Sequence, residues 1–169
     1  MKFLIVVDIQ VDFISGALGS EQAMNIVPSV VEKVKNFSGT VIFTRDTHSD
    51  NYLDTQEGKK LPIPYCIKGT DGWEICDELQ TYVDKAVGKV TFGSVDLPSI
   101  LRSYNEDIEE IELCGLCTDI CVISNAMILK AAFSETKIIV DAKCCAGVSE
   151  KSHNTALDAM RAVQIEIID

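Results

Sequence analysis

Three cysteines lie close together in the segment CGLCTDIC, residues 114–121, where an apolar run changes into a helical pattern. A cysteine in the first turn of a helix lies near the positive end of the helix dipole and near free backbone N–H groups, which lower its pKa and favour the thiolate. Cys121 meets that condition, in a turn for which Thr118 and Asp119 are candidate caps. Cys114 ends the apolar run, a position typical of inert packing. Cys121 is therefore the candidate nucleophile.

A thiol nucleophile needs a base, and the chain has only two histidines for the common Cys–His arrangement. His153 falls inside an amphipathic segment, where a surface position or a hydrogen-bonded structural role is expected. His48 follows Asp46 by two residues, so both side chains point the same way in an extended segment, which suits a metal or a loop contact. Asp8, which ends the first apolar run, is the better candidate base because partial burial would raise its pKa toward the working range. The alternative is that Asp8 only caps the following turn.

Lys89, in the segment GKVTFGS, is a further candidate for the site. If its ammonium reaches the other groups, it favours both a thiolate and an ionised aspartate. The alternative is an exposed lysine at the end of a strand, which is the commoner position for this residue type.

These residues need a scaffold, and six apolar, β-branched runs that end in turn or polar residues predict its strands. The runs are KFLIVVD, GTVIFTRD, KAVGK, IEEIELCG, TKIIVDA and AVQIEIID. Helical spacing occurs between them, roughly over residues 25–37, 73–82, 97–104, 119–133 and 149–162. Buried strands that alternate with apolar-faced helices are typical of a parallel sheet covered on both sides. We therefore predict a three-layer α/β/α sandwich, formed by residues 1–169 as a single domain, with a six-stranded, mainly parallel sheet.

Ligands bind beyond the carboxyl ends of the strands in an open parallel sheet. The candidate residues Asp8, Asp46, Lys89 and Cys121 all follow or end predicted strands. An irregular region over roughly residues 45–72 is long enough to have a functional role. The sequence thus predicts one site at the carboxyl edge of the sheet.

Composition and charge exclude several classes of partner. The chain has 169 residues, and its formal net charge of -11 repels nucleic acid and anionic membranes. The N-terminal run FLIVV is too short for a membrane span or a signal core. The seven cysteines lack the regular spacing of a disulfide framework, which favours reduced thiols and a cytoplasmic location.

Five motifs follow one another along nearly the whole chain: VVDIQVDF, TRDTH, CIKGTDGWE, GKVTFGS and CGLCTDICV. Together they resemble the isochorismatase-like cysteine hydrolases, in particular the nicotinamidase-related branch. The resemblance implies a Rossmann-like strand order, a homo-oligomer, and a catalytic triad of Asp8, Lys89 and Cys121. It also implies a cis peptide bond between Leu116 and Cys117, with the backbone N–H groups of Cys117 and Cys121 as an oxyanion hole.

The activity that this resemblance implies is hydrolysis of a small-molecule amide through a thioester. Nicotinamide, which gives nicotinate and ammonia, is the best single substrate. Phe13 and Tyr65 are expected at the substrate pocket, with Phe13 either against a flat substrate ring or in the core. Metal-independent enzymes that cleave ureido or carbamoyl amides, or the vinyl ether of isochorismate, are the alternative. Because the vinyl-ether enzymes need no nucleophilic cysteine, the thiol of Cys121 favours amide hydrolysis.

The metal site is where the sequence departs from the nicotinamidases. Those enzymes bind a divalent metal, for which zinc is our expectation, through an Asp-x-His pair and a second histidine. Asp46 and His48 match the pair, but Tyr65 stands where the second histidine is expected. A neutral phenol, with a reference pKa of about 10, is a poor ligand. The sequence therefore supplies two of three expected ligands, which weakens the case for nicotinamide.

Three other classes stay open. CGLC is a C-x-x-C sequence at a strand–helix junction, as in thioredoxin-like redox proteins, although no proline follows it to supply the cis-proline of that fold. The thiols of Cys114, Cys117 and Cys121 are also those of a zinc-stabilised binding module, but a fourth ligand at suitable spacing is missing. The third class is a hydrolase-like scaffold that has lost catalysis and binds a partner or a small molecule.

Overall fold

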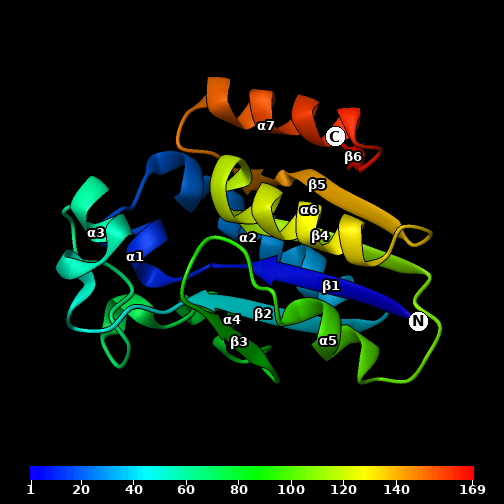
Figure 1. Ribbon diagram of the computed structural model, residues 1–169, viewed down its shortest axis with the longest axis horizontal. Helices are drawn as coiled ribbons and strands as arrows, with labels where there is room; N and C mark the ends of the chain where they lie inside the picture. Colours follow the sequence, from blue (N-terminus) through cyan, green and yellow to red (C-terminus); the bar gives the residue numbers. More distant parts are fainter.

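The computed structural model describes all 169 residues and contains one six-stranded sheet. Its strands are β1 (Lys2–Val7), β2 (Thr40–Asp46), β3 (Ala86–Lys89), β4 (Glu110–Leu116), β5 (Lys137–Ala146) and β6 (Glu166–Ile168). They follow the order β3-β2-β1-β4-β5-β6, and every pair of neighbours is parallel (Figure 1). The six predicted strands and the Rossmann-like order are thereby confirmed.

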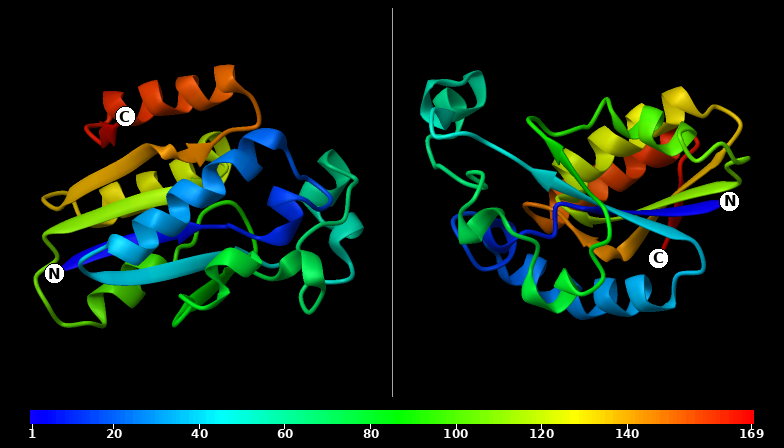
Figure 2. Two further views of the ribbon diagram at one scale, coloured as in Figure 1. Left: turned by 180° about the vertical axis from the view of Figure 1, so that it is seen from behind. Right: turned by 90° about the horizontal axis from the view of Figure 1, so that it is seen from below.

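Helices cover both faces of the sheet and make three layers (Figure 2). On one face, α2 (Glu21–Asn36) packs on β4 and β5, and α4 (Asp77–Gln80) lies beside it. The other face carries α6 (Ile123–Ala132) and α7 (Glu150–Ala162), with α5 (Leu97–Arg102) against α6. The predicted three-layer fold class is correct. No helix is both long enough and apolar enough to cross a membrane.

The central strand β1 shows how the sequence specifies this architecture. All five residues of its FLIVV run are fully buried, because β1 has a strand on each side and helices over both faces. A strand of this kind has a continuous apolar run instead of an alternating one. Two of the long helices on the sheet begin at serine caps: Ser20 Oγ accepts from Ala23 N at the start of α2, and Ser149 Oγ accepts from Ser152 N at the start of α7.

The predictions for helices need three corrections. The helix predicted over residues 73–82 is only the short α4, preceded by the 3₁₀ turn η2 (Asp71–Trp73). The region over residues 45–72 is not wholly irregular, because it contains η1 (Tyr52–Asp54) and α3 (Gln56–Lys60). Thr118 and Asp119 do not cap their turn, because the Thr118 hydroxyl pairs with His153 Nδ1 and Asp119 Oδ1 accepts from Val148 N.

The strand order reverses between β1 and β4, which makes a crevice at the carboxyl ends of these two strands. The short helix α1 (Val11–Ile14) and α3 lie at this end of the sheet (Figure 1). The fold therefore places the expected ligand site where β1 to β4 end.

Candidate active site

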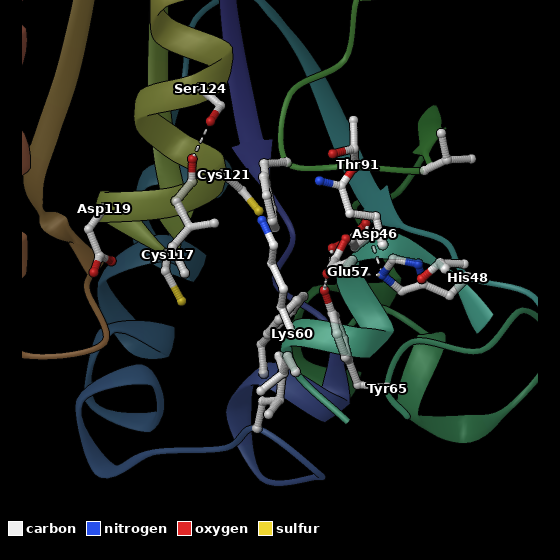
Figure 3. A pocket seen from close by; sticks show the side chains of 18 residues that line it. Asp46, His48, Glu57, Lys60, Tyr65, Thr91, Cys117, Asp119, Cys121 and Ser124 are labelled. Carbon is white, nitrogen blue, oxygen red and sulfur yellow. Dashed lines mark hydrogen bonds and ion pairs between the residues drawn. The ribbon is translucent and has the colours of Figure 1, made fainter. Parts of the chain in front are cut away.

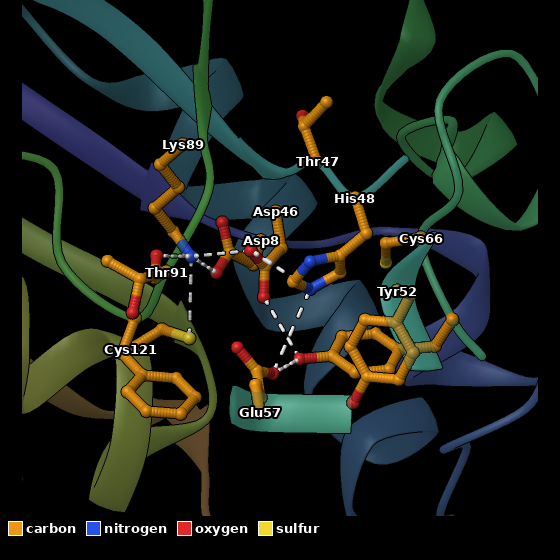
Figure 4. Close-up of polar contacts among 12 residues, drawn as sticks. Asp8, Asp46, Thr47, His48, Tyr52, Glu57, Cys66, Lys89, Thr91 and Cys121 are labelled. Carbon is orange, nitrogen blue, oxygen red and sulfur yellow. Dashed lines mark hydrogen bonds and ion pairs between the residues drawn. The ribbon is translucent and has the colours of Figure 1, made fainter. Parts of the chain in front are cut away.

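Four neighbouring strands each bring one reactive group to the carboxyl edge of the sheet (Figure 4). Asp8 follows β1, Asp46 ends β2, Lys89 ends β3, and Cys121 lies in the turn after β4. Asp46 and Lys89 are Cα partners in the β2–β3 pairing, so the register of these strands sets their separation. Residues far apart in the sequence thus meet at one point.

Lys89 is at the centre of this cluster. Its Nζ lies 2.6 Å from Asp8 Oδ2, 3.5 Å from Asp46 Oδ1 and 3.5 Å from Cys121 Sγ. It also donates a hydrogen bond to the Thr91 carbonyl oxygen at 3.1 Å. The Lys89 side chain is 1% exposed, so the alternative of a solvent-exposed lysine at a strand end is wrong.

Asp8 is fully buried and is held by the neighbouring strand. The Thr44 hydroxyl donates to Asp8 Oδ1 at 2.7 Å and accepts from the Asp8 backbone N–H at 3.3 Å. The Asp8 backbone is left-handed, with φ of 48°, which aspartate tolerates better than most residues. Thr44 was not predicted as a site residue, although its two-residue spacing from Asp46 places both side chains on one face of β2.

Burial and charge together set the protonation of the three groups. Burial raises the pKa of Asp8 above its ordinary value, and the ammonium of Lys89 opposes that shift. Burial lowers the pKa of Lys89, but the charges of its partners outweigh this effect, so its pKa is raised and it stays a cation. Burial also raises the pKa of Cys121 well above that of a free thiol. The predicted lowering of this pKa by the helix dipole is wrong, because desolvation is the larger effect.

Cys121 lies in η3 (Thr118–Val122), a single π-helical turn between β4 and α6. Such turns are frequent at functional sites. The Leu116–Cys117 peptide bond that leads into the turn is cis. The Cys117 carbonyl oxygen accepts from the N–H groups of Ile120 at 3.1 Å and Val122 at 3.0 Å, which fixes the turn.

Asn125, fully buried in α6, connects this turn to the segment that follows β3. Its Nδ2 donates to the Cys121 carbonyl oxygen at 2.8 Å, and its Oδ1 accepts from the Ser94 N–H at 2.9 Å. Asn125 was not predicted, because spacing in the sequence gives no sign of a contact with residue 94. It holds the nucleophile turn against the chain that carries Lys89.

A pocket of about 780 Å³ opens in front of the Cys121 thiol (Figure 3). Residues of η3 and α6 line one side of it, and α3 with the loop to Tyr65 lines the other. Phe13 also lines the pocket, and its ring centroid lies 5.4 Å from that of Tyr65. The pocket is large enough for a small ring compound, and its walls are partly aromatic.

Asp46, His48 and Glu57 form a second polar cluster beside the first (Figure 4). Asp46 Oδ1 lies 3.6 Å, and Glu57 Oε1 3.8 Å, from His48 Nε2. Asp46 and His48 are buried, and neither Asp46 Oδ1 nor His48 Nε2 has a hydrogen-bond partner. Two atoms that each bind zinc at about 2.1 Å are at most about 4.2 Å apart, and both carboxylate distances to His48 Nε2 fall within that limit, so the cluster is a candidate site for a divalent ion.

Tyr65 stands beside this cluster. Its hydroxyl donates to Glu57 Oε1, and it lies 3.4 Å from Asp46 Oδ2. Burial raises the pKa of Tyr65, and the charges of Asp46 and Glu57 raise it further, so the phenol stays neutral. Glu57 thus adds a third potential ligand atom beside Asp46 and His48. It was not predicted, because no periodicity in the region over residues 45–72 relates α3 to β2.

The alternatives based on the other thiols do not fit the geometry. Cys114 is fully buried within β4, burial raises its pKa, and all seven cysteines are free. A partner thiol therefore has no access to it, contrary to a redox role. The thiols of Cys114, Cys117 and Cys121 do not gather closely enough to hold one metal ion. His153 has a structural role, since its Nδ1 lies 2.7 Å from the Thr118 hydroxyl.

Comparison with known proteins gives relatives over the full length of the chain. The isochorismatase domain family matches residues 2–169. The chain is 27% identical to the nicotinamidase/pyrazinamidase of Mycobacterium tuberculosis, over 99% of this chain and 98% of that protein. The structure of Pyrococcus horikoshii pyrazinamidase in complex with zinc matches with a TM-score of 0.84 and 27% identity, over 99% and 98% of the two chains. N-carbamoylsarcosine amidase from Thermoplasma acidophilum matches with a TM-score of 0.81 and 26% identity, over 98% and 94%.

The fold, the pocket and these relatives define a hydrolase that acts on amide C–N bonds. Within that class, the chain belongs to the isochorismatase domain family. Its relatives place it with the nicotinamidase-related branch, as the five sequence motifs indicated.

Proposed function

We propose that the chain is a cysteine amidase that hydrolyses a small-molecule amide through a thioester, with nicotinamide as the best single substrate. The observation that carries this proposal is the contact of Lys89 Nζ with both Asp8 and Cys121 Sγ, since Cys121 lines the pocket. The arrangement supplies a base, a nucleophile and a fixed positive charge, and all three side chains are buried.

Asp8 is the base of the first half-reaction. Its carboxylate, paired with Lys89, takes the proton of the Cys121 thiol, and the sulfur attacks the amide carbon. The backbone N–H groups of Cys117 and Cys121 stabilise the oxyanion. The C–N bond then breaks, and Asp8 returns the proton to the departing nitrogen, which leaves as ammonia when the amide is primary. Burial raises the pKa of the Cys121 thiol, which favours transfer of its proton as the sulfur attacks.

Water completes the second half-reaction. Asp8, ionised again, takes a proton from water as the oxygen adds to the thioester carbon. The C–S bond breaks, the sulfur recovers its proton from Asp8, and the carboxylic acid leaves. For nicotinamide, the products are nicotinate and ammonia. Lys89 stays charged throughout and balances the negative charge that moves between Asp8 and the substrate.

We also propose that Asp46, His48 and Glu57 hold a divalent metal, with zinc as the first candidate. The support is that the buried atoms Asp46 Oδ1 and His48 Nε2 have no hydrogen-bond partner, although Lys89 Nζ lies 3.5 Å from Asp46 Oδ1, together with the zinc complex of the Pyrococcus relative. When bound by these residues, such an ion would supply an electrophile for a ring nitrogen of the substrate. Phe13 and Tyr65 would then lie against the ring.

The test is ammonia release by the purified protein from nicotinamide and pyrazinamide, followed by ureido and carbamoyl compounds. Cys121→Ala is the matched control, and the metal content is determined on the same samples. We expect ammonia from nicotinamide with the wild type alone. Failure of every amide in the panel would overturn the proposal and favour a non-amide substrate or a silent scaffold.

A metal-independent ureido or carbamoyl amidohydrolase is the second candidate. Tyr65 in place of a second histidine favours it, as does the likeness to N-carbamoylsarcosine amidase. Cleavage of a carbamoyl compound with nicotinamide inert would select this candidate. A vinyl-ether hydrolase of the isochorismatase type is expected to keep its activity in Cys121→Ala, which separates it from both amidases.

We infer a reducing, cytoplasmic compartment and a homo-oligomer. All seven cysteines are free thiols, and six of them are buried, which suits a reducing environment. Val90, Phe92 and Val95, near the pocket, are exposed apolar side chains of the kind that subunit contacts cover. Light scattering coupled to gel filtration measures the oligomeric state, and a monomer would contradict the inference.

A further inference from the structure

Within the cluster of Asp46, His48 and Glu57, the element that carries Glu57 is the one held in place by the fewest contacts. Glu57 lies on α3, a five-residue helix in the long connection between β2 and β3, whereas Asp46 and His48 belong to the end of β2 and the turn after it. Glu57 is half-buried, and its carboxylate contacts only His48 Nε2 and the Tyr65 hydroxyl among polar groups. A short helix at the rim of a pocket does not by itself fix a ligand, so the orientation of Glu57 depends on those contacts.

Tyr65 is held much more firmly than the residue it contacts. Its side chain is 3% exposed and packs among three other rings. The ring centroids of His48, Tyr52 and Phe13 lie 4.8, 5.3 and 5.4 Å from that of Tyr65. The next residue in the chain, Cys66, donates its backbone N–H to Asp12 Oδ2 at 2.7 Å. The Tyr65 hydroxyl is thus presented at a fixed point between Glu57 and Asp46.

We propose that Tyr65 is a positioning residue of the metal site: its hydroxyl, donated to Glu57, holds that carboxylate beside Asp46 and His48. A neutral phenol has one proton to donate, and Glu57 as an ionised carboxylate can accept it and still bind a metal through a remaining lone pair. Ligating carboxylates are usually hydrogen-bonded in this way by outer partners. Tyr65 therefore replaces a direct histidine ligand with a side chain that orients a different ligand. This inference rests on the proposed metal site, but not on the identity of the amide.

Metal affinity tests the proposal directly. Zinc binding to the metal-free full chain is measured by calorimetry in competition with a chelator, and cobalt(II) absorption reports the ligand field. Tyr65→Phe removes only the hydroxyl, and we expect zinc affinity to fall about 10- to 100-fold, with a changed cobalt spectrum. Tyr52→Phe is the matched control, because the Tyr52 hydroxyl donates to the Leu61 carbonyl oxygen at 2.9 Å and to no ligand. This control is expected to leave both readouts unchanged.

A double-mutant cycle shows whether Tyr65 acts through Glu57. We expect Glu57→Ala to weaken zinc binding, and Tyr65→Phe to cause no further loss in the Glu57→Ala background. An equal loss in both backgrounds, unchanged affinity in Tyr65→Phe, or absence of zinc binding to the wild type would each overturn the proposal. If Tyr65→Phe does not fold, Tyr65→His takes its place in the cycle. The loss of zinc affinity caused by Glu57→Ala must then be smaller in the Tyr65→His background than in the wild type. An equal loss in the two backgrounds overturns the proposal.

The experiments distinguish failure of the amidase proposal from failure of the proposed role of Tyr65. Ammonia release that depends on Cys121 establishes the amidase whether or not zinc binds. Zinc affinity that depends on Tyr65 and Glu57 establishes the positioning role even if the substrate is not among the amides tested.

Discussion

Lys89 Nζ and Asp8 Oδ2 lie 2.6 Å apart in a site that hides both side chains almost completely from solvent. A buried charge costs several kcal/mol unless it is paired, so each residue depends on the other for its charge. In the proposed mechanism the pair also sets the path of the catalytic proton, because Lys89 keeps its own protons and Asp8 accepts that of Cys121.

We predict that Lys89→Met both inactivates and destabilises the protein. The substitution leaves the carboxylates of Asp8 and Asp46 without their cation, and breaking a buried pair in this way costs about 3–5 kcal/mol. Urea unfolding measures the loss. Lys137→Met is the control, because Lys137 pairs with Glu166 at an exposed site where ion pairs contribute at most about 1 kcal/mol. Equal stability of the two variants would contradict the prediction.

Thr44→Val is predicted to shift the pH dependence of the reaction while the fold is kept. The hydroxyl that donates to Asp8 Oδ1 stabilises the ionised carboxylate, so its loss raises the pKa of Asp8 further. The acidic limb of the pH profile of kcat/KM should therefore move to higher pH, with a lower maximum. An unmoved acidic limb would show that Thr44 only packs against the site.

Stability is predicted to fall steeply in alkaline solution. Burial raises the pKa of all seven thiols, to about 12 for Cys76, Cys117 and Cys144. The unfolded chain, with ordinary thiol pKa values of 9.0, loses these protons first, so above that pH the folded state binds more protons. The free energy of unfolding then falls as the pH rises, by up to about 1.4 kcal/mol per pH unit for each thiol.

Denaturant titrations between pH 7 and pH 11 check this prediction. The free energy of unfolding should be nearly constant up to about pH 8 and should fall from about pH 9 upward, since the thiol contribution is complete below the unfolded pKa. Cys144→Ala removes one of the seven groups and should give a shallower fall. A flat profile to pH 11 would mean that the thiols ionise alike in both states.

Cys114→Ala is predicted to keep the hydrolytic activity, in contrast to Cys121→Ala. Cys114 is buried in β4 and does not line the pocket, so its sulfur contributes packing alone. The small cavity should cost about 1 kcal/mol in unfolding free energy. Ammonia release measures the activity, and its loss in Cys114→Ala would revive the C-x-x-C interpretation.

Much of the fold could be predicted because its signals are local. The runs KFLIVVD and TKIIVDA are strands buried on both faces, and such strands show in the sequence as unbroken apolar runs. The meeting of Asp8, Lys89 and Cys121 could also be expected, since parallel strands end at one edge of a sheet.

The rest of the site depends on contacts between segments with no regular spacing. Glu57 lies near Asp46 because of the path that the long connection between β2 and β3 takes, and no periodicity in the sequence predicts that path. The pKa of Cys121 was predicted with the wrong sign, because the helix dipole is evident from the sequence while the depth of burial is not. Asn125 and Thr44 were missed because each contacts a candidate catalytic residue from a neighbouring element.

The pairing of β1 with β4 at the centre of the sheet divides the chemistry between two halves of the chain. Asp8, Asp46 and Lys89 precede the mostly exposed connection over residues 103–109, and Cys121 follows it. A chain cut in that connection would yield two fragments, one with the proposed base and one with the proposed nucleophile, and neither is expected to turn over substrate alone. Activity would return only when β4 docks beside β1 in register, which makes this protein a natural scaffold for a split-enzyme reporter.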